Sequence, residues 1–367
     1  MLLLATKVWE QRKLGNLFNE RKERSTEGEL LSVTLSNGVI KFSDLNKKDN
    51  SNIKSGNYKI VKRNDIPYNS MRMWQGASGV SSYDGIVSPA YTVLIPNKNS
   101  NSNFYAVLFK KKSILNLFTR FSQGLTSDTW NLKYPILKDI NVPFTNLEEQ
   151  KRIFKIFNVV NNLLALYEKK KQLLTQLKQG IVNFLITKNE QKPQLRFSGF
   201  NNNWESKSFE KLLNYEQPIK YIVKKADYIS QGTPVLTANK SFILGYTNET
   251  NVYQNIPAII FDDFTLESKY VDFPFMIKSS AIKILTSKNS NLFFIYQLLN
   301  NQRFVQEGHS RHYISVVQKK KVLVPSIQEQ NKISDLIKQL EDNIELSSNT
   351  IVLLKKLKGF LLQNMFL

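Results

Sequence analysis

Residues 149–187 read EQKRIFKIFNVVNNLLALYEKKKQLLTQLKQGIVNFLIT, and residues 329–367 read EQNKISDLIKQLEDNIELSSNTIVLLKKLKGFLLQNMFL. The two segments align without a gap, and Leu173-Leu174 of the first matches Leu353-Leu354 of the second. Their separation of 180 positions is much longer than the unit of a solenoid, which is roughly 20–50 residues. The repeat therefore predicts that a whole architectural module is used twice.

Both segments carry a heptad pattern, in which apolar residues step alternately by four and three positions. One position of each pattern is polar, Lys171 in the first copy and Ser347 in the second, as happens where register is specified. A helix of about 38 residues extends about 57 Å. We expect the two helices to form an antiparallel coiled coil, and the alternative is that each helix packs separately on its own globular neighbour. The predicted seam consists of Ile153, Phe157, Val160, Leu164, Leu174, Ile333, Ile337, Leu340, Ile344, Ile351 and Leu354.

A longer mixed region precedes each helix, and the pair Trp9-Glu10 near the start of the first region matches Trp204-Glu205 in the second. The offset of this pair is 195 instead of 180, so the globular parts differ in length. Short β-rich runs and turn signals predict an α+β fold with a strongly curved sheet. An antiparallel pair of the two helices would give the chain a pseudo-twofold arrangement. The expected organisation is a globular domain at 1–145, a helix at 146–188, a second globular domain at 189–325 and a second helix at 326–367.

Within these regions, residues 86–95 and 258–261 are predicted to be strands, and Asn37-Gly38 is a turn signal. Residues 104–118 and 292–304 have helical patterns and close the two globular regions. Pro143 and Pro325 precede the Glu-Gln pairs and mark the entry into each long helix.

The chain has 51 Lys and Arg against 30 Asp and Glu, a formal net charge of +21, and no cysteine. This charge predicts a polyanionic partner, either nucleic acid or an anionic membrane surface. The absence of cysteine excludes disulfides, thiolate zinc sites and a cysteine nucleophile. No run of about 18 apolar residues occurs, so no membrane-spanning helix is expected. These observations predict a cytoplasmic protein.

Catalytic motifs are missing from the sequence. No Walker loop is present, so the chain is not expected to hydrolyse ATP. His309 and His312 have a spacing that could hold a metal on a helix, but neighbouring Gly308 favours a polar loop and no metal site is predicted. Asp262-Asp263 could form a metal site or an acid/base pair, although a turn after a strand is favoured. The sequence therefore indicates binding and predicts no catalytic residue.

Several polar segments are candidates for DNA contact. Residues 69–76 place amide and guanidinium donors beside an aromatic residue, and such donors read base edges in the major groove. Loops led by Gly124 and Gly308 occupy equivalent places before the two long helices and carry hydroxyls that suit phosphate. In each segment a purely structural role is the alternative. The candidate DNA-binding residues are Asn69, Ser70, Arg72, Gln75, Thr126, Ser127, Thr237, Asn239, Lys240, Ser310, Arg311 and Tyr313.

Taken together, these features closely resemble the specificity subunit of type I restriction-modification systems, over nearly the whole chain. The segments that carry the resemblance are Trp9–Leu14, Gly85–Tyr91, Trp204-Glu205 and Pro325–Gln330 with Ile333. Only eight residues precede Trp9, which would fit a truncated or alternative start.

The resemblance implies a non-catalytic subunit in which each globular region is a target-recognition domain that reads one half of a split, asymmetric site in double-stranded DNA. It also implies that the helices set the spacer and dock two methyltransferase (modification) subunits, through which restriction subunits bind. S-adenosylmethionine, ATP and Mg are then expected on the partner subunits, and none on this chain. The absence of a [DN]-P-P-[YF] motif agrees with this assignment. The alternative is a basic coiled-coil scaffold or membrane-surface protein without DNA sequence specificity.

Overall fold

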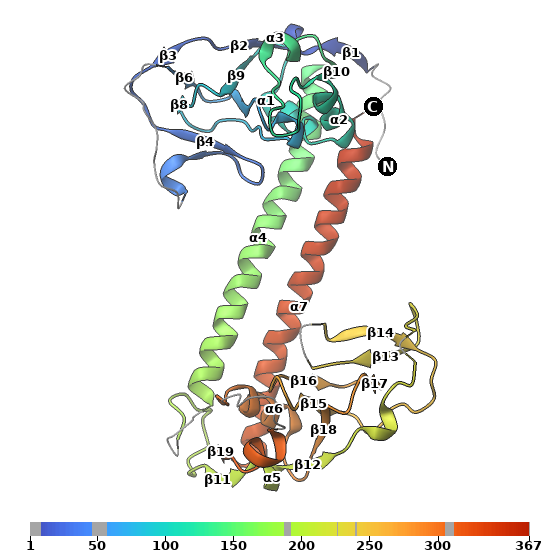
Figure 1. Ribbon diagram of the computed structural model, residues 1–367. Coiled ribbons are helices and arrows are strands. Elements are labelled where there is room, and N and C mark those ends of the chain that lie inside the picture. The colour runs from blue at the N-terminus through green and yellow to red at the C-terminus, as the bar shows by residue number, and fades with distance from the viewer. Residues whose placement is uncertain are drawn as a thin grey trace. The chain divides into compact units, whose positions relative to one another are not determined.

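The computed structural model describes residues 9–45, 57–186, 192–225, 227–238, 241–304 and 312–366. The chain divides into two compact units. Unit 1 contains Met1–Glu168 together with Asn349–Leu367, and unit 2 contains Lys169–Ser348. The long helices α4 (Leu147–Leu185) and α7 (Ile327–Asn364) therefore each contribute residues to both units (Figure 1).

Unit 1 contains four small β-sheets, with strand orders β1-β10, β2-β9-β7, β3-β6-β8 and β4-β5. The neighbouring strands of all four sheets are antiparallel. The strands are β1 (Glu10–Lys13), β2 (Phe18–Glu20), β3 (Arg24–Ser25), β4 (Leu31–Thr34), β5 (Gly38–Lys41), β6 (Tyr58–Val61), β7 (Ile66–Asn69), β8 (Gly85–Val87), β9 (Tyr91–Pro96) and β10 (Asn141–Phe144).

The short helices of unit 1 are α1 (Ser102–Leu108), α2 (Lys112–Phe121) and α3 (Tyr134–Leu137). Short 3-10 helices lie at Leu14–Asn16, Phe42–Asp44 and Met73–Gln75.

Unit 2 contains a four-stranded sheet with the order β12-β18-β15-β16, a three-stranded sheet β14-β13-β17 and the pair β11-β19. Its shorter helices are α5 (Phe209–Leu212) and α6 (Leu292–Asn300), with a 3-10 turn at Ile219–Tyr221 and a π-helical turn at Tyr313–Val317. The strands are β11 (Glu205–Ser208), β12 (Leu213–Glu216), β13 (Thr233–Leu236), β14 (Ile243–Thr247), β15 (Ala258–Asp262), β16 (Ser268–Val271), β17 (Met276–Ile277), β18 (Ile282–Ser287) and β19 (Lys321–Val324).

The mixed helix and strand content confirms the predicted α+β class, but the expectation of one curved sheet was wrong. Most strands have four residues or fewer, so the sheets stay small. The run 86–95 was predicted as one strand and is two, because a turn in which Tyr91 N–H donates to Ser88 O (3.0 Å) separates β8 from β9. Similarly, the helix predicted at 104–118 is divided into α1 and α2, and α6 ends at Asn300. The Asn37-Gly38 turn joins β4 to β5 as predicted.

The match between Trp9-Glu10 and Trp204-Glu205 marks the same structural junction in both units. Strand β1 pairs with β10, with Glu10 opposite Phe144, and β11 pairs with β19, with Glu205 opposite Val324. Each pair ties the start of a globular region to the strand that leads into its long helix. The tryptophans pack on equivalent helices, since the ring centroids of Trp9 and Phe104 of α1 are 6.2 Å apart and those of Trp204 and Phe294 of α6 are 6.0 Å apart.

Each hydrophobic core contains the beginning of one long helix and the end of the other. In unit 1, Ile153 and Phe157 of α4 pack in the same cluster as Phe366, which lies just after α7. In unit 2, Ile333 and Ile337 of α7 share a cluster with Leu185 of α4. The helices are therefore antiparallel within each unit, as predicted.

The predicted seam is buried or half-buried at every apolar position, and α4 and α7 pack together. In unit 1, Val160 and Leu164 of α4 cluster with Ile351 and Leu354 of α7. The outer seam residues contact the globular cores instead, so the alternative of packing on the globular neighbour is also partly correct. Of the two polar positions, Ser347 is buried and donates to Asn343 O (2.7 Å), whereas Lys171 is exposed.

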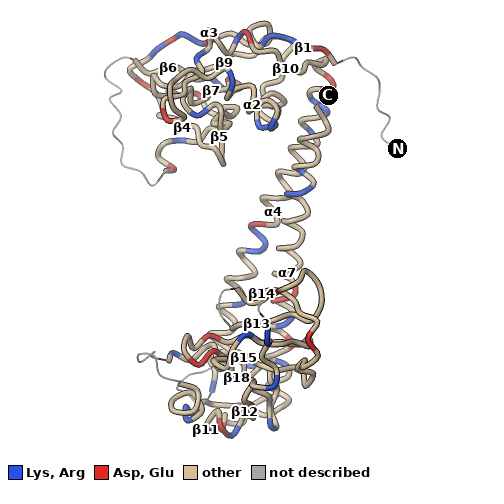
Figure 2. The backbone as a smooth tube through the Cα atoms, turned by 45° about the vertical axis from the view of Figure 1, so that its right-hand side comes forward, with Lys and Arg blue, Asp and Glu red and all other residues tan. Residues whose placement is uncertain are grey.

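No helix in the described part of the chain is both long enough and apolar enough to span a membrane. Lys and Arg are distributed over the globular parts of both units and along α4 (Figure 2).

Candidate nucleic-acid interface

The candidate segment 69–76 begins at the last residue of β7 and is held in a compact turn. Asn69 Oδ1 accepts the backbone N–H of Met71 (3.0 Å), and Trp74 Nε1 donates to Met71 O (3.1 Å). Met73 is fully buried and anchors the turn, which ends at Gly76 with φ +85°, a conformation that favours glycine. We call residues 69–76 loop A.

A second loop, residues 123–131, is closed by two backbone hydrogen bonds between Gln123 and Asn131 (2.8 and 3.0 Å). Within it, Thr129 N–H donates to Thr126 O (2.9 Å), and the Thr129 hydroxyl accepts the backbone N–H of Thr126 (3.1 Å). We call residues 123–131 loop B.

The structure joins loops A and B, which are about 50 residues apart in the sequence. The rings of Trp74 and Trp130 pack edge to face with centroids 5.2 Å apart, and the Leu132 N–H donates to Ser70 O (2.8 Å). Loops A and B thus form one surface, which we call the A/B surface.

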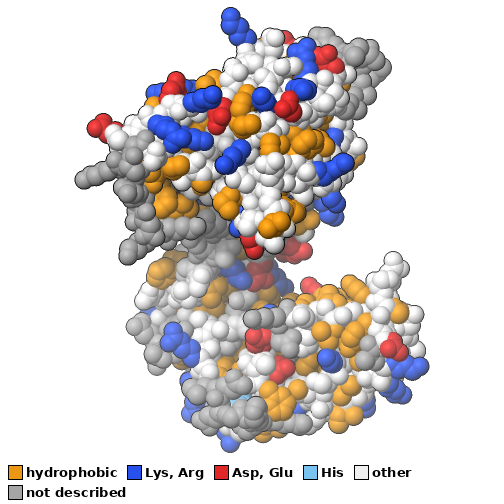
Figure 3. All heavy atoms as spheres, turned by 45° about the horizontal axis from the view of Figure 1, so that its top comes forward, with side chains coloured by type: hydrophobic (Ala, Val, Ile, Leu, Met, Phe, Trp, Pro, Cys, Tyr) orange, Lys and Arg blue, Asp and Glu red, His pale blue; other side chains and the backbone are white. Residues whose placement is uncertain are grey.

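The predicted contact residues differ in their accessibility on this surface. Gln75, Thr126 and Ser127 are exposed, and Asn69 and Arg72 are half-buried. Ser70 is buried, and its hydroxyl lies 2.9 Å from that of Thr92, so it supports the loop instead of reaching outward. Figure 3 shows Lys and Arg side chains interspersed with apolar side chains on the faces in view.

Lys110 forms hydrogen bonds with the backbone at the end of loop A. Its Nζ donates to the carbonyl oxygens of Gly76 and of Ser78, the latter at 3.1 Å. Burial, and to a smaller extent the nearby charge of Lys358, lowers the pKa of Lys110 to about 8. Sequence reasoning did not identify Lys110, because a lysine within the run 110–112 gives no signal that its amine is buried.

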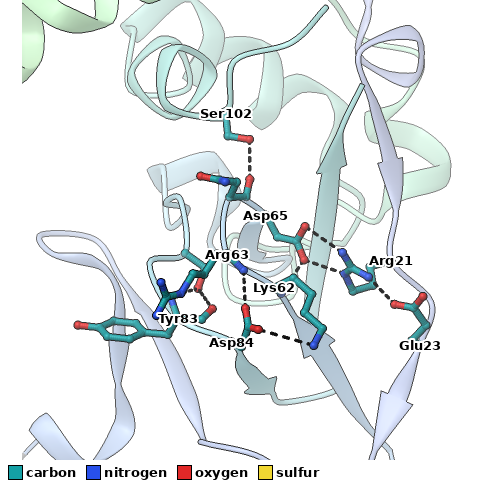
Figure 4. Close-up of polar contacts among 10 residues, drawn as sticks. Arg21, Glu23, Lys62, Arg63, Asp65, Tyr83, Asp84 and Ser102 are labelled. Carbon is teal, nitrogen blue, oxygen red and sulfur yellow. Dashed lines mark hydrogen bonds and ion pairs between the residues drawn. The ribbon is translucent and has the colours of Figure 1, made fainter. Parts of the chain in front are cut away.

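An ion pair between half-buried Arg21 and buried Asp65 stabilises the sheet that presents loop A (Figure 4). The guanidinium of Arg21 donates to both carboxylate oxygens of Asp65 (2.7 and 3.2 Å), just before β7 begins. The hydrogen bond with Asp65 raises the pKa of Arg21 above its usual value. Asp65 also accepts the backbone N–H of Lys62 (2.8 Å), so this carboxylate fixes the turn ahead of the strand.

In unit 2 the predicted contact residues are less accessible. Thr237 is buried at the end of β13. Tyr313 is 1% exposed and packs in the core against Tyr215 and Phe261, with ring centroids 5.4 and 5.5 Å away. A side chain so deeply packed is poorly placed for direct contact with DNA. Asn239, Lys240, Ser310 and Arg311 lie outside the described residues.

Asp262 has the role in a turn that its sequence context indicated. Its Oδ1 accepts the backbone N–H groups of Phe264 (3.0 Å) and Thr265 (2.9 Å). Asp263 instead forms a buried ion pair with Lys283 (3.5 Å) and accepts the N–H of Tyr313 (2.7 Å). His309 lies outside the described residues, and no group of three potential metal ligands occurs in the part that the structure describes.

Both long helices expose a second apolar stripe away from the seam. In unit 2, Leu173 (52% exposed) and Leu177 lie on the outer face of α4. In unit 1, their repeat equivalents Leu353 (64% exposed) and Leu357 lie on α7. Each unit therefore carries one copy of the same exposed pair of leucines.

A comparison with known families assigns the chain. The family described as "Type I restriction modification DNA specificity domain" matches residues 6–176 and again residues 201–356. The chain belongs to this family. The two matches fall on the two halves of the internal repeat, each containing a globular region and most of its long helix.

Relatives within the specificity-subunit family agree with this assignment. The chain is 50% identical over 123 residues to the type I restriction enzyme EcoR124I/EcoR124II specificity subunit of Escherichia coli, which covers 31% of this chain and 30% of the relative. It is 25% identical over 284 residues to a putative type I restriction enzyme MjaX specificity subunit of Methanocaldococcus jannaschii, covering 69% of this chain and 65% of the relative. The chain thus aligns with less than two thirds of the length of these curated relatives.

A solved structure shares the fold over the full length. The crystal structure of the type I restriction-modification system S subunit from M. genitalium has a TM-score of 0.66 and 15% sequence identity, and the comparison covers 100% of this chain and 98% of that one. At this identity the similarity establishes the fold alone. It confirms the predicted two-domain α+β architecture with two long helices.

Proposed function

We propose that this chain is the DNA sequence-specificity subunit of a type I restriction-modification complex, and that it reads a bipartite asymmetric DNA site. The observation that carries the proposal is the double match of the specificity family to the two halves of the repeat. The two globular regions differ from each other while their long helices are equivalent, so the two regions would read two different half-sites. The family match favours this function over a basic scaffold or membrane-surface protein.

In unit 1 the A/B surface is the proposed reader of one half-site. Arg72 and Gln75 of loop A carry the donor groups that discriminate guanine and adenine edges. The hydroxyls of Thr126 and Ser127 in loop B are exposed and suit phosphate oxygens, which position a protein without reading sequence. The Trp74–Trp130 contact keeps these two functions in a fixed relation.

In unit 2 the residues that read the other half-site remain a prediction. Thr237, Asn239, Lys240, Ser310 and Arg311 are the candidates from the sequence, and Tyr313 is the least favoured because of its burial.

The exposed leucine pairs are the proposed docking sites for two methyltransferase subunits. Leu173 with Leu177 and Leu353 with Leu357 are related by the same 180-residue repeat, so each pair offers the same chemistry to one copy of a partner. S-adenosylmethionine, ATP and Mg would then act on the partner subunits, and restriction subunits would join through the methyltransferases. We propose no catalytic role for this chain and a cytoplasmic location for the complex.

Selection from a random DNA library tests the proposal. The full chain with its methyltransferase subunits should enrich a motif of two specific halves separated by unread bases. The variant R72A/Q75A should relax the half that unit 1 reads and leave the other half unchanged, because each good base contact contributes about 1–3 kcal/mol of discrimination. Arg63→Ala, an exposed arginine outside loops A and B, is the matched control. Absence of any enriched motif would refute the function.

A further inference from the structure

The tip of loop B carries a fully exposed leucine. Leu125 is 100% exposed. Among the described residues of the first globular region, the exposed large apolar side chains are Leu35, Met71, Phe121 and Leu125. Met71 lies in loop A, and Phe121 lies two residues before loop B. Exposed apolar side chains thus concentrate at the A/B surface.

The backbone that presents Leu125 is held on both sides. The Gln123–Asn131 hydrogen bonds close the loop beneath it, and the Thr126–Thr129 bonds brace the adjoining segment. Trp130 then fixes the loop against Trp74. These contacts fix the backbone of the loop, so a side chain at the tip can insert into another molecule without a change in the conformation of the loop.

The charges around the tip favour an anionic partner. Loop A and residues 120–133 contain three cations, Arg72, Arg120 and Lys133, and one carboxylate, Asp128. Arg120 and Lys133 are exposed. The tip therefore combines a protruding apolar side chain with flanking positive charge, which complements a stack of apolar bases between two phosphate backbones.

We infer that Leu125 is a wedge that enters the base stack of the bound DNA and partly unstacks one base step. The inference rests on the proposed DNA-reading function and assigns a separate action to loop B. Apolar side chains, leucine among them, insert between base steps in this way and kink the duplex. Insertion encloses the whole side chain, whereas contact with a groove wall would leave much of Leu125 in water. The wedge would make recognition sensitive to how easily the base step opens, even where no hydrogen bond reads it.

Fluorescent base analogues test the wedge on the selected DNA site. In a series of duplexes, 2-aminopurine replaces each adenine in turn and pyrrolocytosine replaces each cytosine, so every base pair carries a probe once. The full chain is used without methyltransferase subunits, because methyltransferases themselves extrude a base. We expect a fluorescence increase at one step within the half-site that unit 1 reads.

Three variants assign the signal to the leucine. L125A should remove the increase and weaken specific binding about tenfold or more. L125F should keep the increase, because phenylalanine also inserts between bases. Leu35→Ala, which truncates an exposed leucine at another turn, should behave like the wild type. The melting temperature of each variant checks that Leu125, which is fully exposed, is not needed for folding.

Each outcome decides between the wedge and the proposed function. Sequence-selective binding without a fluorescence increase at any step, or an increase that persists in L125A, overturns the wedge and leaves the proposed function intact. Selective DNA binding that L125A leaves unchanged, together with loss of methyltransferase binding by L125A, would make the tip a protein-docking site instead. A chain that selects no DNA sequence even together with its methyltransferase subunits overturns the function and the wedge together.

Discussion

Gln150 and Gln330 share two equivalent hydrogen bonds in the two units. The amide oxygen of Gln150 accepts the N–H of Asn101 (2.8 Å), and that of Gln330 accepts the N–H of Asn291 (2.9 Å). The amide nitrogens donate to the carbonyl oxygens of Thr145 (2.7 Å) and Pro325 (2.9 Å), five residues earlier in each case. Because Asn101 and Asn291 cap α1 and α6, each glutamine joins a long helix to the short helix of its globular region.

Replacement of either glutamine should destabilise its own unit. Gln150→Ala leaves the half-buried Asn101 N–H and the buried Thr145 O without their partner, and we expect a loss of about 2–3 kcal/mol in the free energy of unfolding. Chemical denaturation measures the loss. Gln172→Ala removes the same amide from an exposed face of α4 and should change little. Equal effects of the two variants would contradict the role of Gln150.

The ion pair between Arg196 and Glu329 should stabilise unit 2. Nε and one terminal nitrogen of Arg196 each lie 2.8 Å from a carboxylate oxygen of Glu329, and the side chain of Glu329 is almost completely buried. Glu329→Gln should cost about 3 kcal/mol, because the partner charge is left without compensation in a largely buried position. The exposed pair of Lys207 and Glu205 supplies the control, since Glu205→Gln should have no measurable effect in the same unfolding experiment.

Lys110 should make stability depend on pH in the alkaline range. Burial, and then the charge of Lys358, lowers the pKa of Lys110 to about 8 in the folded protein, whereas the unfolded chain keeps the proton up to about pH 10.4. The unfolded state therefore binds more protons between these values, so this group's contribution raises the free energy of unfolding as pH increases. Below about pH 8 the buried amine of Lys110 is charged, and its desolvation lowers the free energy of unfolding by the full amount.

The measurement compares the wild type with Lys110→Met by denaturation at several pH values between about 7.5 and 10.5. The wild type should gain stability relative to the variant by up to about 3 kcal/mol across this window. Lys112→Met, at an exposed position nearby, should track the wild type. A constant difference between the wild type and Lys110→Met would contradict the assignment.

Two neighbouring positions of α7 should separate stability from partner binding. Ile351 belongs to the seam, and Ile351→Ala should cost about 2–4 kcal/mol because it leaves a cavity. Leu353 points outward, so Leu353→Ala should leave the melting temperature unchanged and reduce binding of the methyltransferase subunits, as measured by calorimetry. Unchanged binding in a double variant with Leu173→Ala would exclude the proposed docking sites.

The length of the long helices should determine the gap between the half-sites. Deletion of four residues from α4 or α7 shortens that helix by about 6 Å and rotates the remaining C-terminal part of the helix about its axis. We expect library selection with the deletion variant to return a different gap or no motif. Return of the original motif with its original gap would argue against a spacer role.

The seam was predictable because its signal is local and repeated. Positions such as Val160 and Ile351 follow from the heptad pattern alone, and the second copy confirms the first. The joining of loops A and B was not predictable, because the Trp74–Trp130 contact depends on the path of α2 and β9 between them. The pattern of either loop says nothing about the other.

The burial of polar residues also could not be predicted from the sequence. Tyr313 comes after a glycine-led polar segment and was placed at a surface, yet a π-helical turn directs its ring into the core. Conversely, the repeated Glu-Gln pair was identified from the sequence as a match between the halves. The role of its glutamines could not be predicted from the sequence. The partners of their amide oxygens, Asn101 and Asn291, are offset by 190 positions instead of 180 and so fall outside the repeat.

The composition of the two cores affects the order in which the chain can fold during synthesis. The core of unit 1 includes Phe366, whose ring lies 5.3 Å from that of Phe104 and 5.8 Å from that of Phe157. Unit 2 is made entirely of residues 169–348, which leave the ribosome earlier. The globular region that is translated first is therefore the one that completes its core last, because the ring of Phe104 meets that of Phe366 only after the whole of α7 has been made.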